Sequence, residues 1–266
     1  MSAVVALLAG MLLAAWPVSS AGAAPAATVS LMHGIPGAPV DVVVDGAVVI
    51  PGFQPGTMQD ISQFAGQTLK NVEVRAAGTA TVVIGPIPSL AVPASGNWTV
   101  IAHLDASGKP TLTPFENDTS SLAAGQGRLI VRHTAAAPAV DVVLADGTRP
   151  FTNLINPREA AAALPAGAIA GAKLAPTGGA PIVDIPTVEL KAGTDLIVYA
   201  VGSLADTTLT FYTQTIDGLG GSPTAVNTGD GLPSSSSMLP TLLVVIAGIM
   251  ALGGTGVLAT RRRIGR

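Results

Sequence analysis

The fold is decided by the stretch Ala38-Pro39-Val40-Asp41-Val42-Val43-Val44-Asp45-Gly46, which returns one hundred residues later as Pro138-Ala139-Val140-Asp141-Val142-Val143-Leu144-Ala145-Asp146-Gly147. A strand-like segment ending in histidine precedes each copy, so His33 and His133 are also one hundred residues apart. Later segments of the two halves align as well: residues 94–102 with 192–200, and 111–113 with 208–210. A correspondence that runs through whole segments predicts a duplicated domain.

Each copy is predicted to be all-β. Successive side chains on a strand point to opposite faces, so Val40, Val42 and Val44 should lie in a core while Asp41 and Val43 share the other face. Asp45 and Gly46 fit a type I′ hairpin turn, whose two central residues need positive φ. Short β-branched runs between Gly and Pro predict the strands of the first copy at residues 28–33, 40–44, 71–76, 81–84, 98–104 and 111–115.

Several such strands within about 90 residues favour a two-sheet sandwich, immunoglobulin-like or transthyretin-like, over a barrel. The one helical candidate is Pro157 to Leu164, where an alanine run follows Arg158 and Glu159. It is too short to change the predicted class.

The repeated pattern, a strand ending in His, a Pro-containing loop and then Pro-x-Val-Asp-Val-x-x-Asp-Gly, resembles domain-of-unknown-function family 4397, a bacterial cell-envelope module. The resemblance covers two tandem copies, at residues 27–120 and 127–215. It implies sandwiches at the surface of a bacterial cell and supplies no reaction. The second copy departs from the pattern, because alanines at 135–137 stand where the first copy has loop proline and polar residues.

The N-terminal end resembles an export signal. Residues 4–16 are almost purely apolar, and Ala21-Gly22-Ala23 has the small-x-small form of a signal-peptidase site. We therefore predict a signal peptide over residues 1–24. The basic residue that usually precedes the apolar stretch is missing, so the alternatives are an upstream start, an atypical signal or a retained anchor.

The C-terminal end predicts a membrane anchor. Residues 239–260 carry no charge and are long enough for a transmembrane helix, and a basic tail follows at residues 261–266. The positive-inside rule places this tail in the cytoplasm, which gives a single-pass type I protein of the cell membrane with extracellular modules. Residues 217–238, rich in Gly, Ser, Thr and Pro, predict a disordered stalk. Wall transfer by a sortase is the less favoured alternative, because no Leu-Pro-x-Thr-Gly precedes the span.

Composition narrows the function further. The chain has no cysteine, which excludes disulfides, thiolate nucleophiles and thiolate metal sites. Four of its thirteen basic residues lie in the C-terminal tail, so nine basic face sixteen acidic residues in the rest of the chain. This acidic balance argues against nucleic acid or anionic lipid as the main partner.

The sequence offers few candidates for chemistry. His33 and Asp41, repeated as His133 and Asp141, form either a ligand or metal site or, as we favour, a structural pair that satisfies backbone groups of the Pro-containing loop. His103 has no counterpart, because Val201 takes its place. A cluster of His33, His103 and Asp105 is the alternative basis for an envelope hydrolase or metal-dependent enzyme.

We accordingly expect no enzyme, with no catalytic, cofactor-binding or metal-binding residues and no cofactor. The expected function is binding or adhesion in the cell envelope by tandem non-catalytic modules on a stalk, an arrangement that suits avidity. The expected partners are the membrane, through one C-terminal helix, and an extracellular protein or envelope polymer. A purely structural spacer is a third reading.

Overall fold

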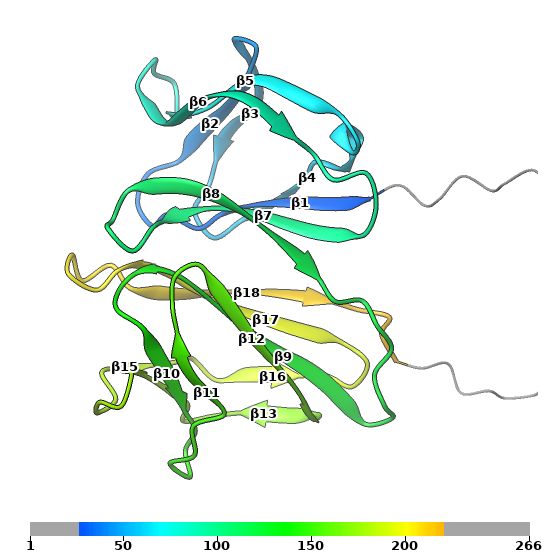
Figure 1. Ribbon diagram of the computed structural model, residues 1–266, viewed down its shortest axis with the longest axis vertical. Coiled ribbons are helices and arrows are strands. Elements are labelled where there is room, and N and C mark those ends of the chain that lie inside the picture. The colour runs from blue at the N-terminus through cyan, green and yellow to red at the C-terminus, as the bar shows by residue number, and fades with distance from the viewer. Residues whose placement is uncertain (1–26, 221–266) are drawn as a thin grey trace, which may run out of the picture. The chain divides into compact units, whose positions relative to one another are not determined.

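The computed structural model describes residues 27–220 (Figure 1). Within this range every regular element is a β-strand except one short 3₁₀ turn, η1 (Ser62–Phe64), so the all-β prediction is confirmed. Among these residues there is no helix with the length and apolar character that a membrane crossing requires. The predicted signal peptide, transmembrane helix and basic tail all lie outside the described residues.

Eight strands build a sandwich from the first half of the chain. Its two sheets have the strand orders β4-β1-β7-β8 and β3-β2-β5-β6. Neighbouring strands are antiparallel except β1 and β7, which run parallel. The bounds are β1 (Thr28–His33), β2 (Val40–Val44), β3 (Ala47–Phe53), β4 (Met58–Asp60), β5 (Thr68–Ala76), β6 (Val82–Ala91), β7 (Asn97–Leu104) and β8 (Pro110–Asn117).

The second half of the described chain builds another sandwich. Its larger sheets have the orders β12-β9-β17-β18 and β11-β10-β14-β15, and β13 pairs with β16. The bounds are β9 (Gln126–Ala136), β10 (Val140–Val143), β11 (Phe151–Leu154), β12 (Arg158–Pro165), β13 (Gly167–Ile169), β14 (Lys173–Pro176), β15 (Val183–Asp184), β16 (Val188–Leu190), β17 (Asp195–Ser203) and β18 (Thr210–Ile216).

The two sandwiches share their central pairing. In the first, Leu31 of β1 lies opposite Val100 of the parallel strand β7. In the second, the parallel strands β9 and β17 place Val131 opposite Val198. We call the two sandwiches module 1 and module 2.

The hairpin predicted around Asp45 and Gly46 is present. These residues connect β2 to β3 with φ of 48° and 79°, the positive values that a type I′ turn needs. The strands predicted from the sequence do not include β3 or β4. The predicted start of β5 is three residues late, and the predicted end of β6 at Ile84 is seven residues short of Ala91.

The helix predicted for Pro157 to Leu164 is wrong. Arg158–Pro165 forms β12, which pairs along its whole length with β9. The alanine run hid the alternation of an edge strand, in which Ala160, Ala162 and Leu164 pack against the core of module 2. Pairing with a neighbouring strand outweighs the helix propensity of a short alanine run.

The predicted start of the stalk also needs correction. Leu219 is buried, its N–H donates to Gly193 O over 2.8 Å, and its carbonyl accepts from Leu122 N–H over 2.7 Å. Residues 217–220 are therefore held against module 2. Residues 221–238 of the predicted stalk lie outside the described range.

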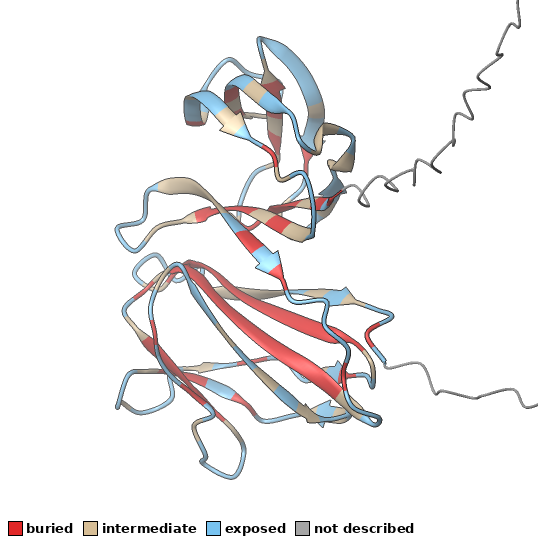
Figure 2. Cartoon of the chain, turned by 45° about the vertical axis from the view of Figure 1, so that its right-hand side comes forward, coloured by how far each residue is buried: buried red, intermediate tan, exposed pale blue. Residues whose placement is uncertain are grey.

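Strands β9 and β17 are buried on both faces, as their continuous red colour in Figure 2 shows. One face of each belongs to the core of module 2, to which Leu129, Val131, Leu196 and Val198 contribute. The other face packs on module 1. A sheet covered on both sides explains the near-continuous apolar runs of these two strands.

Sheet β4-β1-β7-β8 of module 1 supplies the other side of this contact. Met32, Ile101 and Phe115 from module 1 form one buried cluster with Ile130 and Tyr199 from module 2. Outside the two sandwich cores the modules therefore share a third core. We call it the inter-module core.

Arg132 lies in the inter-module core with no exposed surface. Its guanidinium donates to Glu159 Oε2 (2.6 Å), Tyr199 OH (2.7 Å) and Asn117 Oδ1 (2.8 Å), and it stacks 4.4 Å from the centre of the Phe115 ring. Asn117 and Phe115 belong to module 1, whereas the other partners belong to module 2. One buried cation thus binds both modules.

Replacing Arg132 with Ala should lower the free energy of unfolding of the full chain by about 3 kcal/mol, because it leaves buried polar partners unpaired and opens a void. Chemical denaturation measures this loss. Arg158→Ala, at an exposed position on β12, is the matched control and should change stability by less than about 0.5 kcal/mol. Equal stability of the two variants would refute the role given to Arg132.

Candidate functional site

The repeated histidines bind loop backbone, as favoured from the sequence. His33 is buried, with Nε2 3.3 Å from Ala38 O and Nδ1 accepting from Ile35 N–H over 3.3 Å. His133 Nε2 is 3.0 Å from Pro138 O, the equivalent carbonyl of the second copy. Burial lowers the pKa of both imidazoles. Each ring therefore braces the loop that follows its own strand.

The repeated aspartates also bind backbone, but not in the loop where we expected their partners. Asp41 accepts from Gly52 N–H (2.7 Å) in β3 and from Gly78 N–H (2.8 Å) in the turn before β6. These bonds, the one from Gly52 first, lower the pKa of its carboxyl group. Asp41 thus ties together two segments that flank β2.

Asp141 repeats this arrangement in module 2. It accepts from Gly178 N–H (3.0 Å) and Asn153 N–H (2.9 Å), and Arg149 Nη1 lies 2.7 Å away. The Gly178 bond, then the Asn153 bond, lower the pKa of the buried Asp141 to about 2. The four repeated residues therefore hold loops in place, and they do not come together as a ligand site.

The cluster of His33, His103 and Asp105 does not form. His33 lies opposite Ala102 in the parallel pair of β1 and β7, so it shares the inward face with Ala102. His103 is one residue further along β7 and points to the opposite face of the sheet. Its Nδ1 contacts Leu104 O and its Nε2 contacts Thr113 Oγ1, both at 2.8 Å and both within module 1. The period-two alternation of a strand separates the two histidines.

Asp105 is also engaged elsewhere. Its Oδ1 accepts from Ser107 N–H (2.8 Å) and Lys109 N–H (2.9 Å) in the turn between β7 and β8. Across residues 27–220 the structure gathers no three His, Asp or Glu side chains that could hold a metal ion. The enzyme alternative thus loses the residues on which it depended.

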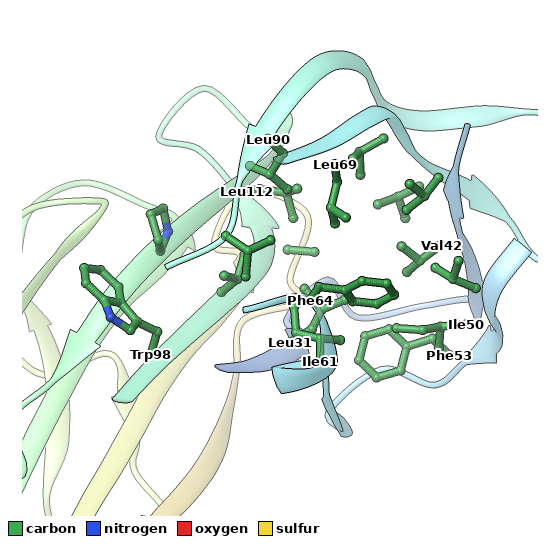
Figure 3. A pocket seen from close by; sticks show the side chains of 18 of the residues that line it. Leu31, Val42, Ile50, Phe53, Ile61, Phe64, Leu69, Leu90, Trp98 and Leu112 are labelled. Carbon is green, nitrogen blue, oxygen red and sulfur yellow. The ribbon is translucent and has the colours of Figure 1, made fainter. Parts of the chain in front are cut away.

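The candidate site is instead an apolar cavity between the two sheets of module 1. Its volume is about 300 Å³, at the lower end of the range typical of small-molecule sites. Figure 3 shows ten of its side chains around the space, with Trp98 at one end. None of the lining residues is charged; the labelled ones are Leu31, Val42, Ile50, Phe53, Ile61, Phe64, Leu69, Leu90, Trp98 and Leu112.

The cavity exists because the inward face of β7 is poorly covered. Val100 points into module 1 and is only half-buried, whereas its counterpart Val198 in module 2 is 2% exposed. Its neighbours Thr99 and Ile101 on the opposite face are fully buried in the inter-module contact. The face of β7 toward module 2 is thus closely packed, whereas its face toward the interior of module 1 is not.

The cavity is not sealed from solvent. Three of its lining residues, Val49, Ala91 and Pro114, are exposed, Val49 by 38%. A closed void of about 300 Å³ would cost about 7 kcal/mol at roughly 24 cal/mol per Å³, which is comparable to the whole stability of an ordinary domain.

A second cavity of about 180 Å³ lies at the His33 end of the same sandwich. Its lining shares Val40, Val74 and Ala102 with the first cavity. The rest of its lining comes from His33, the loop of Ile35 to Pro39, Ala76 at the end of β5 and Val83 in β6. The two cavities therefore adjoin within one sandwich.

Comparison with known proteins gives one family match. Residues 27–143 match a family described as "Domain of unknown function (DUF4397)". The DUF4397 match runs from the start of module 1 through β10 of module 2. It supports the resemblance for one copy, and DUF4397 membership of a second copy stays a prediction.

Two further comparisons add little. No curated protein matches the chain. A solved structure of the family CBM26 module CBMbc from Eubacterium rectale Amy13K, in complex with maltoheptaose, is 7% identical, with a TM-score of 0.20; the alignment covers 71% of this chain and 96% of that one. A likeness this weak carries no argument about fold or ligand.

The sequence reading missed the cavity of the DUF4397 segment. Its lining is made of the same aliphatic residues that fill an ordinary core, so the composition gives no signal. A weak signal lies in the pairing of halves, because Trp98 and Val100 of module 1 align with Leu196 and Val198 of the better-covered module 2.

The hollow interior can be tested without a ligand. Ala102 lines both cavities, so Ala102→Leu should fit into open space and change the free energy of unfolding by less than about 1 kcal/mol. Ala200 holds the equivalent position in β17 and is 1% exposed, so Ala200→Leu should overpack module 2 and cost about 1–3 kcal/mol. Chemical denaturation of the two full-length variants gives the comparison, and equal losses would argue against an open core.

Proposed function

We propose that the chain is a non-catalytic binding protein of the bacterial cell envelope, in which module 1 takes up an apolar ligand and module 2 supports it. The single observation that carries this proposal is the uncharged cavity of about 300 Å³ inside module 1. A cavity half this size, engineered into another protein and lined by aliphatic and aromatic side chains, stays dry and binds small apolar molecules.

The roles proposed for the modules, ligand binding by module 1 and support by module 2, follow from their packing. Burial of both faces of β9 and β17 makes module 2 the better-packed half, and Arg132 fixes it to module 1. The outward face of β7 is held flat against this support while its inward face borders the cavity. This arrangement favours one pre-formed site on a rigid support over two independently tethered modules acting by avidity.

Anchoring at the cell membrane completes the proposal. The apolar segment at residues 239–260 and the basic tail that follows support a single-pass type I orientation with both modules outside the cell. After carbonate washing of cell membranes, the full chain should remain in the pellet. A chain with residues 239–266 deleted should be released to the soluble fraction, and recovery of both in the supernatant would contradict the anchor.

Ligand uptake can be followed through Trp98, which lines the cavity. The chain has two tryptophans, and Trp16 lies in the predicted signal peptide, so Trp16→Phe keeps Trp98 the sole donor whether or not that segment is removed. Titration of this full-length variant with 1-aminoanthracene, a compact apolar fluorophore, should quench Trp98 emission by energy transfer and should saturate.

Blocked variants separate the cavity from non-specific partitioning. Val100→Phe and Leu112→Phe each place a ring into the cavity from β7 or β8 and should weaken saturable binding at least tenfold. Ala123→Leu, at an exposed position between the modules, should leave it unchanged. Absence of saturable transfer, or equal binding by all four proteins, would overturn the proposed function.

A further inference from the structure

The two cavities of module 1 lie end to end along the strands. The larger one extends from Trp98 and Phe64, and the smaller one ends at His33 and Pro36. Their shared wall consists of three small or medium aliphatic side chains, Val40, Val74 and Ala102. Only these three side chains separate the two spaces, and neither lining contains a charged group.

We propose that this space holds a single unbranched alkyl chain that lies along the strands and keeps its polar head outside in water. The inference rests on the proposed function, and it adds the chemical class of the ligand.

The shape of the space selects a linear ligand. Along β7, the lining residues run from Trp98 to Ala102, which at about 3.3 Å per residue is a length of about 13 Å before the loop at Pro36 adds to it. The width is limited by the separation of two packed sheets, about 10 Å between backbones, from which both layers of side chains must be subtracted. A space that extends this far along the strands has room for an extended alkyl chain.

Neither lining offers a partner for a buried charge. The only polar lining side chain of the smaller cavity is His33, and both of its ring nitrogens already contact loop backbone, at Ala38 O and Ile35 N. A carboxylate or phosphate held inside would bury a charge without a partner, which is costly. Exposed lining residues, Val49 and Pro114 in the larger cavity and Ala38 in the smaller one, leave room for a head group to stay in water.

The length of the ligand's alkyl chain is the variable that tests this inference. Straight-chain alcohols from octanol to hexadecanol should displace 1-aminoanthracene from the Trp16→Phe chain, with affinity rising about fourfold per added methylene, the fold-change equal to ~0.8 kcal/mol per buried CH₂. The gain should stop once the chain outgrows the space. Ala102→Leu adds bulk between the two cavities. In this variant the gain in affinity with chain length should stop at a shorter alcohol, while the shortest alcohol binds as before.

Failure of this inference differs from failure of the proposed function. If 1-aminoanthracene binds but alcohols displace it with no dependence on length, or branched alcohols of equal carbon number compete equally, the linear-chain inference is wrong and the apolar site stands. If 1-aminoanthracene does not bind saturably, both are wrong.

The chain can come from a free fatty acid or from a membrane lipid, and two labelling arms distinguish these sources. The full-length protein in lipid nanodiscs is photolysed with a diazirine-bearing free fatty acid in one arm and with a diazirine-bearing phosphatidylglycerol in the other. Crosslinks mapped to the inward faces of β2, β5 and β7 in either arm support the inference and name the source. Crosslinks confined to other surfaces in both arms overturn it.

Discussion

The packing of one module's sheet against the other's determines the rest of this structure. Sheet β4-β1-β7-β8 and sheet β12-β9-β17-β18 each give their outward face to the inter-module core, so β9 and β17 have no wet face at all. Apolar contact supplies most of the driving force for such packing, because it removes area from water on both sheets. Arg132 fixes the orientation of the two sheets relative to each other. Its planar guanidinium donors are satisfied only when Asn117, Tyr199 and Glu159 are all in place.

The shared packing also explains how two copies of one pattern came to differ. Arg132 stands one hundred residues after Met32, and both side chains lie in the inter-module contact at equivalent positions of β9 and β1. A pair of arginines in that place would bring two like charges into a buried core, whereas one arginine and one methionine leave a single cation with a full set of partners. Beyond the contact, module 2 fills its own interior and module 1 does not.

The features that sequence could predict are those set by local rules. The repeat, the strand content and the positive φ of Asp45 and Gly46 follow from spacing and turn chemistry. The bracing role of His33 and His133 follows from the need to satisfy buried polar groups. The structural role expected for Asp41 is also present. Its partners Gly52 and Gly78, however, belong to segments that only the fold brings near.

The features that sequence could not predict depend on contacts between distant segments. The alanines of β12 carry no visible alternation, and the separation of His33 from His103 depends on the register of β1 against β7. The double burial of β9 and β17 did leave a trace in the sequence: Leu129-Ile130-Val131 and Leu196-Ile197-Val198 read as unbroken apolar runs where a half-exposed strand would alternate. That trace indicates burial on both faces and does not say which sheet covers the second one.

The clamp around Leu219 has a mechanical consequence. The chain leaves the described fold at Gly220, which bridges in parallel to Leu122 in the segment that joins the modules, and Leu219 is bonded on one side to Gly193 and on the other to Leu122. Tension applied to the chain beyond Gly220 therefore reaches this short bridge before it reaches β18. These few backbone contacts would therefore be loaded before the longer ladder that joins β18 to β17.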